Sequence, residues 1–171
     1  MNTIDKIKNG NLIDAVHLED TEKRVKRAFD EMLSGYDFTI DMKKFESKSD
    51  DIVVKSGIPI SFLCPHHLLP VIGTAYFGYI PNGWICGISK IIRLINGMSK
   101  VAIIQEEIGD YILNEFDKQL NPKGSILLID ATHSCEVVRG VSEKTITTSV
   151  CAHGCFREKD LEMKFLNLIR R

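Results

Sequence analysis

Apolar residues recur along the chain with two different periods, and the changes of period mark the expected elements. Residues 21–33 repeat at helical spacing and predict a helix whose first residue is its N-cap. Residues 52–63 and 71–80 are rich in β-branched and aromatic side chains, which indicates two strands. The turn sequence Pro81-Asn82-Gly83 closes the second strand. The first half of the chain is therefore expected to form a helix followed by strands.

In the second half of the chain, the apolar residues also switch between helical and strand patterns. Residues 89–95 predict a helix capped by its first residue, and a longer helix is expected over 100–120. Residues 125–133 and 145–152 are strand candidates, and the tail 157–171 has a helical pattern. The order helix, strands, two helices, strands, helix is typical of an α+β fold with a mostly antiparallel sheet.

Length and charge narrow the possible functions. The 171 residues fit one domain, which we expect over 21–171, preceded by a loose segment 1–20. The net charge of −1 provides no general field for nucleic acid or for a membrane surface, so neither partner is expected. Any anion site must therefore be a local cluster of Lys and Arg.

Hydropathy and cysteine content favour a cytoplasmic protein. No apolar run approaches the ~20 residues of a membrane-spanning helix, and the N-terminus has no signal-peptide pattern. The five cysteines are then expected to be reduced, and their odd number also argues against a closed set of disulfides. Cysteines near histidines become candidates for a metal site or a catalytic thiol.

Two separated Cys–His segments indicate a metal site. Cys64 and His67 lie three residues apart, so one turn can aim both at one ion, and Cys135 completes a Cys2His set. Zinc prefers these ligands, and three protein ligands suit a catalytic zinc, which leaves His66 and His133 for acid–base work. A structural zinc site remains an alternative, because either of these two histidines could supply a fourth ligand. A lone Cys is also commonly a small buried apolar side chain.

A third Cys–His group lies near the end of the last predicted strand. Cys151, His153 and Cys155 alternate, so a continuous strand would place all three on one face. This pattern is compatible with a second metal site. The preferred interpretation is that these residues, like Cys86, are ordinary residues of the sheet or of a strand end.

A basic cluster and an adjacent Gln–Glu pair are candidates for ligand binding. Ser89 at a helix start leaves free backbone N–H groups, and Lys90 and Arg93 are close enough on one helix to contact one phosphate. Arg139 could join them. The carboxylate of Glu106, next to Gln105, could accept hydrogen bonds from a guanine. The alternative for each of these residues is a solvated helix surface, which spacing alone favours for the Gln–Glu pair.

Five short motifs in a fixed order resemble those of the GTP cyclohydrolase I family. They are residues 21–25 (TEKRV), 64–67 (CPHH), 87–93 (GISKIIR), 105–106 (QE) and 133–140 (HSCEVVRG). The resemblance covers most of the chain. It implies the tunnelling fold (T-fold), an α+β fold in which an antiparallel sheet carries two helices on one face, with an additional N-terminal helix.

The resemblance also implies a reaction and its central residues. Cys64, His67 and Cys135 would hold Zn²⁺, which activates a water for attack on C8 of GTP. His133 would protonate N7, and His66 would assist the proton transfers as the rings open and formate leaves. The implied product is 7,8-dihydroneopterin triphosphate.

Further roles follow from the same resemblance. Ser89 would help the rearrangement of the sugar carbons, and Gln105 and Glu106 would recognise the guanine. The triphosphate would be bound by Arg24, Lys90, Arg93 and Arg139. The family also implies a ring-shaped homo-oligomer, often a decamer, with active sites between subunits.

Several positions depart from the family pattern. Pro65 replaces a Glu between the first Cys and His, Glu107 replaces an Arg, and Ser99-Lys100 stands where an Arg pair is usual. These changes suggest a divergent member, for which a different end product is an alternative. A non-catalytic zinc-binding homologue and a nitrile reductase of the same fold are the other candidates, and the C-x-H-H and H-x-C motifs favour the hydrolase over the reductase.

Overall fold

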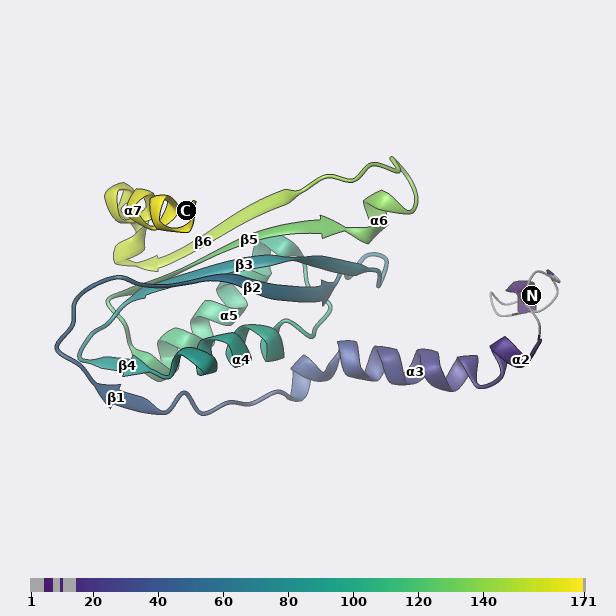
Figure 1. Ribbon diagram of the computed structural model, residues 1–171, viewed down its shortest axis with the longest axis horizontal. Helices are drawn as coiled ribbons and strands as arrows, with labels where there is room; N and C mark the ends of the chain where they lie inside the picture. The colour runs from purple at the N-terminus through teal and green to yellow at the C-terminus, as the bar shows by residue number, and fades with distance from the viewer. Residues whose placement is uncertain (1–4, 8–9, 11–14, 171) are drawn as a thin grey trace.

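The computed structural model describes residues 5–7, 10 and 15–170 of the chain. Figure 1 shows a main antiparallel sheet with helices on both faces and a helical arm that projects from one end. The predicted loose segment 1–20 falls partly on residues 1–4, 8–9 and 11–14, which lie outside the described residues. The described elements are α2 (Ala15–Leu18), α3 (Thr21–Met32), η1 (Ser34–Asp37), β1 (Lys44–Glu46), β2 (Val53–Leu63), β3 (Pro70–Ile80), β4 (Trp84–Cys86), α4 (Ile88–Met98), α5 (Gln105–Leu120), β5 (Gly124–His133), α6 (Ser134–Val137), β6 (Thr147–Gly154), η2 (Cys155–Arg157) and α7 (Lys159–Ile169).

The main sheet has four antiparallel strands in the order β2-β3-β5-β6, and β1 pairs with β4 in a separate two-stranded ribbon. The β2 strand contains a bulge: its register with β3 shifts between Lys55 and Ile58, and Gly57 adopts a positive φ of 71°. Glycine tolerates this left-handed backbone, so β2 continues on both sides of the bulge. The α+β prediction with a mostly antiparallel sheet is confirmed.

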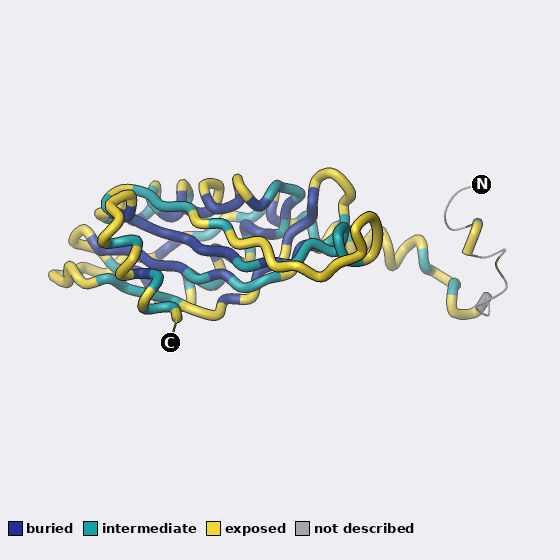
Figure 2. The backbone as a smooth tube through the Cα atoms, turned by 90° about the horizontal axis from the view of Figure 1, so that it is seen from above, coloured by how far each residue is buried: buried dark blue, intermediate teal, exposed yellow. Residues whose placement is uncertain are grey.

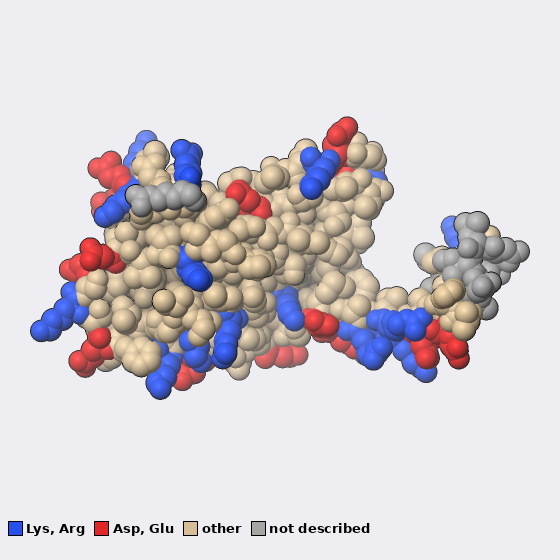
Figure 3. Space-filling model, in the orientation of Figure 1, with Lys and Arg blue, Asp and Glu red and all other residues tan. Residues whose placement is uncertain are grey.

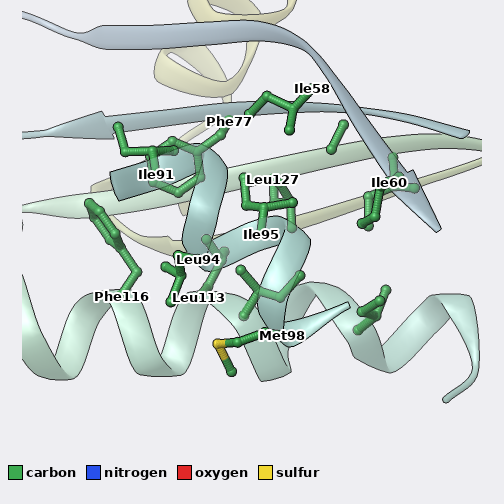
Figure 4. Close-up of a cluster of buried hydrophobic side chains, with 14 of the residues drawn as sticks. Ile58, Ile60, Phe77, Ile91, Leu94, Ile95, Met98, Leu113, Phe116 and Leu127 are labelled. Atoms are coloured by element: carbon green, nitrogen blue, oxygen red, sulfur yellow. The ribbon is translucent and has the colours of Figure 1, made fainter. Parts of the chain in front are cut away.

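The core lies mainly between the sheet and the pair α4 and α5, as the expected two helices on one face require. Phe77 of β3 meets Phe116 of α5 edge-on at 4.8 Å between ring centroids, and both are fully buried. Ile91 and Ile95 of α4 belong to the same cluster (Figure 4). Edge-to-face aromatic pairs add to the burial of apolar surface, so this contact fixes the two helices against the sheet.

The opposite face of the sheet is covered by α7, which the sequence pattern did not assign to a face. Ile126 and Leu128 of β5 point to this side and pack with Phe156 and Phe165, whereas Leu127 and Ile129 point to the main core. Side chains alternate between the two faces of a strand, so β5 is apolar on both sides because both sides are covered.

Two helix boundaries differ from the predictions. The long helix begins at Gln105 rather than near residue 100, because the segment before it pairs with the end of β2: Leu63 N donates to Val101 O at 2.9 Å, and Ile103 N donates to Leu63 O at 3.0 Å. At the N-terminal helix, Asp20 rather than Thr21 is the N-cap residue.

The helix α3 extends away from the sheet as an arm. None of its residues is buried, and Figure 2 shows it exposed along most of its length. Basic and acidic side chains alternate over it (Figure 3), as in the pair Lys26–Asp30 at 2.6 Å. Among the described residues, no helix is both long enough and apolar enough to cross a bilayer.

Candidate active site

The sheet register brings the two Cys–His motifs together at one end of the molecule. Val71 of β3 is paired with Phe62 of β2 on one side and with His133 of β5 on the other. Cys64 and Cys135 each follow one of these strands by only one or two residues. The ends of β2 and β5 and the start of β3 therefore meet at the same sheet end, on the right in Figure 1.

A tight turn aims the first motif. His67 N donates to Cys64 O at 3.4 Å and Leu68 N donates to the same oxygen at 2.8 Å, while Cys64 N donates to Leu69 O. Pro65 occupies the second position of this turn, where its fixed φ is favoured and its missing N–H is not needed. Proline therefore fits the turn without the Glu expected from the resemblance.

Three ligand atoms converge at this end. One ligand atom each of Cys64, His67 and Cys135 lies within 4.8 Å of the other two. Burial raises the pKa of the Cys135 thiol, and the neighbouring Cys64 sulfur raises that pKa further. A cation between the sulfurs would remove this penalty, because thiolates are the ligand form. The donor set of two sulfurs and one imidazole fits zinc.

Both remaining histidines lie beside these ligands. His66 Nδ1 is 3.7 Å from Cys64 Sγ, and the His66 side chain is exposed. His133 is partly buried at the end of β5, where its ring meets Phe62 edge-on.

Gln105 holds His133 in one orientation. The Gln105 side chain is 2% exposed, and its Nε2 donates to Thr147 O at 2.8 Å and to Ile129 O at 3.2 Å. Its Oε1 is therefore the acceptor for His133 Nε2–H at 2.8 Å. The family resemblance implied that Gln105 is a guanine ligand, but did not indicate this contact with His133, which depends on three separate chain segments.

These residues line a cavity of about 410 Å³. Its wall includes the metal-binding cluster, both histidines, Gln105, Glu106 and Arg139. Glu106 is exposed in the first turn of α5, and Arg139 Nη1 donates to His67 Nε2 at 3.1 Å. The cavity thus combines a metal-binding cluster, a positioned imidazole, a carboxylate and a guanidinium. Together these groups can support metal-assisted hydrolysis of an anionic substrate.

Comparisons with known proteins give the family. The model of the family described as GTP cyclohydrolase I matches residues 6–170. This chain belongs to the GTP cyclohydrolase I family. The chain is 38% identical to GTP cyclohydrolase 1 of Hyperthermus butylicus, over 86% of this chain and 75% of the relative. It is 36% identical to GTP cyclohydrolase 1 of Methylococcus capsulatus, over 90% and 86% of the two chains.

Among solved structures, the chain is similar to the apo form of the archaeosine synthase QueF-Like. The identity is 16%, the TM-score is 0.48, and the match covers 60% of this chain and 95% of that one. The family has the tunnelling fold, so the tunnelling-fold prediction is confirmed.

Four residues given roles by the family resemblance, Ser89 in catalysis and the other three in substrate binding, lie away from this cavity in the single chain. Ser89, Lys90 and Arg93 are in the first two turns of α4, which starts next to β4 near the other end of the sheet (Figure 1). The helix starts at Ile88 with Gly87 as its N-cap residue, so Ser89 is not the cap. Arg24 lies on α3, where its guanidinium donates to the backbone oxygens of His17 and Glu19.

The third Cys–His group is only partly brought together. Cys151 and His153 share the face of β6 that meets α5, with Cys151 Sγ 3.7 Å from His153 Nε2. Cys155 follows Gly154, whose φ is 55°, and packs in the cluster on the opposite face of the sheet. The strand ends at Gly154, so the expected alternation stops before the last Cys.

Proposed function

We propose that this chain is a zinc-dependent GTP cyclohydrolase I, which opens GTP at C8, releases formate and forms 7,8-dihydroneopterin triphosphate in the cytoplasm. The observation that carries the proposal is the convergence of Cys64, His67 and Cys135 in one cavity with His133 and Glu106, in a member of this family. We assign residues 21–171 to one catalytic domain.

The metal role follows from the donor set. Two thiols and one imidazole suit Zn²⁺ better than Mg²⁺ or Ca²⁺, which prefer oxygen ligands. When bound, zinc supplies Lewis acidity that brings the pKa of a coordinated water to about 7. Three protein ligands leave a coordination position open for that water.

His133 is the proposed acid for N7 of the purine. Gln105 assigns the proton of the neutral ring to Nε2 and leaves Nδ1 to exchange a proton with the substrate. A positioned acid of this kind contributes about 10²–10⁴-fold to the rate. His66, exposed beside Cys64, is the proposed partner for later proton transfers.

Glu106 and Arg139 are the proposed contacts to GTP within this chain. The N1–H and N2 amine of guanine are donors, and the exposed Glu106 carboxylate in the cavity wall can accept from both. Gln105 is assigned mainly to positioning His133, because its amide is occupied inside the protein. Arg139 lies in the cavity wall in contact with His67 of the metal-binding cluster, and its guanidinium suits a phosphate oxygen.

A second subunit is the proposed source of the remaining contacts. The start of α4, with Ser89, Lys90 and Arg93, lies near the opposite end of the sheet from this cavity. A neighbouring subunit in a ring-shaped homo-oligomer, of decamer type, would bring its own copies of these residues to the cavity. Exposed apolar side chains beside both regions support association: Ile88 is 61% exposed and Val141 is 72% exposed. Among the described residues, the outer edge of β6 and that of β2 before Leu63 have no strand partner, which leaves them available for pairing. Arg24 on the projecting arm is assigned to substrate on the same grounds.

Incubation of the purified protein with GTP and Zn²⁺ tests this function, with formate and pterin fluorescence as readouts. Cys135→Ala is expected to lose zinc at this cluster together with formate release. His133→Ala is expected to keep that zinc and lose activity. His17→Ala, which removes an imidazole from α2 outside the cavity, is the matched control and is expected to keep both.

Two results would contradict the proposal. Zinc bound at the cluster without formate from GTP would indicate a non-catalytic homologue. Full turnover by His133→Ala would remove His133 from the acid role and leave the metal assignment standing.

A further inference from the structure

A second group of metal-ligating side chains lies between α5 and β6, away from the candidate active site. One ligand atom each of Asp110, Cys151 and His153 lies within 4.8 Å of the other two. Cys151 is paired with Leu127 of β5, which lies six positions before His133 at the cavity. Six residues of strand span about 20 Å, so this group cannot share an ion with Cys64 and Cys135.

The geometry points to a second Zn²⁺ site, with Asp110, Cys151 and His153 as its three protein ligands. Contacts within the chain already hold these three ligand atoms close together. Asp110 Oδ1 is 2.8 Å from His153 Nε2, and Cys151 Sγ is 3.3 Å from the same carboxylate oxygen. A thiolate, an imidazole and a carboxylate are the ligand types that zinc takes, and a water can complete the tetrahedron.

Asp117 supports the ligand histidine from behind. Its Oδ2 accepts a hydrogen bond from His153 Nδ1 at 2.7 Å, which leaves Nε2 directed at Asp110 and Cys151. Its other oxygen accepts from the hydroxyl of the fully buried Ser125 at 2.6 Å. Histidines that bind metals commonly donate their second N–H to a carboxylate, which fixes the ring and strengthens the ligand.

The backbone is shaped to allow this approach. Asp110 and Asp117 are seven residues apart on α5 and so lie on one face, and Cys151 and His153 are two apart on β6. Between them, Gly109 allows close contact, because a Cβ added there would lie 2.6 Å from Cys151 Cβ. The helix could not lie against Cys151 in this way with any larger residue.

The site would act as a clip that fastens the edge strand β6 to α5. In the part of the chain that the structure describes, β6 pairs with β5 alone, and the Cys151 side chain packs into the core that α5 shares. A metal ion bound by one ligand from α5 and two from β6 would cross-link the two elements at this edge. This role does not depend on the reaction with GTP.

Metal content of the full-length protein tests the second site. The protein is stripped with a chelator, incubated with excess Zn²⁺, desalted and analysed for zinc. We expect two zinc ions per chain in the wild type, and one in each of two double variants, Cys64→Ala/Cys135→Ala and Cys151→Ser/His153→Ala. Cys155→Ser, which changes a neighbouring cysteine on the opposite face, is the matched control and should keep two.

Two further variants guard against loss of zinc through misfolding. Asp110→Asn changes a side chain that is 61% exposed, so the fold should persist while affinity for the second zinc falls at least about 10-fold. Asp117→Asn should weaken the second zinc by about 10–100-fold through the histidine. Circular dichroism of both variants should match the wild type.

Substitution with Co²⁺ identifies the ligands directly. In the Cys64→Ala/Cys135→Ala background, bound Co²⁺ should show a thiolate charge-transfer band that Cys151→Ser abolishes. The proposal is overturned if the wild type binds a single zinc that Cys64→Ala/Cys135→Ala removes, or if Cys151→Ser/His153→Ala still binds two. Bound Co²⁺ without the thiolate band would equally exclude Cys151 as a ligand.

Discussion

The two ends of the sheet differ in how much of the candidate active site each one builds. At one end the proposed ligands Cys64 and Cys135 and the proposed acid His133 meet within a single chain, because hydrogen-bonded strands place them in adjacent registers. At the other end, Lys90 and Arg93 stand on α4 and do not line that cavity. The groups that must be placed most accurately for the reaction thus come from one chain. The contacts to a long, flexible triphosphate can be shared between chains.

We call the sheet end with Cys64, Cys135 and His133 the metal end, and the end with Lys90 and Arg93 the cationic end. The strongest test of the metal end is removal of the Cys64 sulfur from the β2–β3 turn. Cys64→Ala leaves two ligands, too few for a catalytic zinc, so formate release should fall below detection. Zinc analysis and the formate assay measure the two effects together. Detectable turnover at the wild-type rate would show that the metal end does not carry the reaction.

The next largest effect is expected at Gln105 of α5, whose side chain bonds to both β5 and β6 at the metal end. Gln105→Leu removes the amide that orients His133, and kcat should fall about 100-fold, the lower range of an acid's contribution. KM should change little, because the cavity wall remains. Gln119→Leu is the matched control: that partly buried amide bonds to the backbone of Ile40 and Met42 at a site outside the cavity, so stability should fall while kcat is unchanged.

A change at the cationic end should act on binding instead. Arg93→Ala removes one charge-assisted contact to phosphate, so KM should rise about 10–100-fold with kcat less affected. Steady-state kinetics with GTP separate the two parameters.

Mixing two defective proteins sharpens the comparison of the two ends. Arg93→Ala and Cys64→Ala, dissociated and reassembled together at equal amounts, should recover about one quarter of the wild-type rate at low GTP. The reason is that about one interface in four then combines an intact metal end with an intact α4. No gain over the separate proteins would show that both ends act within the same chain, or not at all.

The smallest effect is expected for the turn that carries the metal ligands. Pro65→Glu restores the residue typical of the family and should keep zinc content, but lower the free energy of unfolding by about 0.4–1 kcal/mol, because proline restricts the unfolded chain. Urea unfolding followed by circular dichroism measures the change. A loss of zinc would instead show that Pro65 is required to shape the site.

Particular residues show why the type of each expected element was predicted correctly while some boundaries were not. The β-branched runs of β2, β3 and β5 located the strands, since a strand buried on at least one face needs such side chains. The helix expected from residue 100 starts at Gln105, because backbone pairing of Val101 and Ile103 with Leu63 overrides a local helical pattern. The three-residue alternation of Cys151, His153 and Cys155 ends at Gly154, where a positive φ turns the chain.

The sequence by itself determined the α+β class, the metal-binding motifs and the family, because these depend on local periodicity and on short runs of ligand residues. The tertiary structure alone decided that Gln105 holds His133, that Arg93 does not line the cavity of Cys64, and that Asp110 meets His153. Each of these contacts joins segments far apart in the chain. Their distances follow from strand register and from the packing of α4 and α5 on the sheet, which no local pattern encodes.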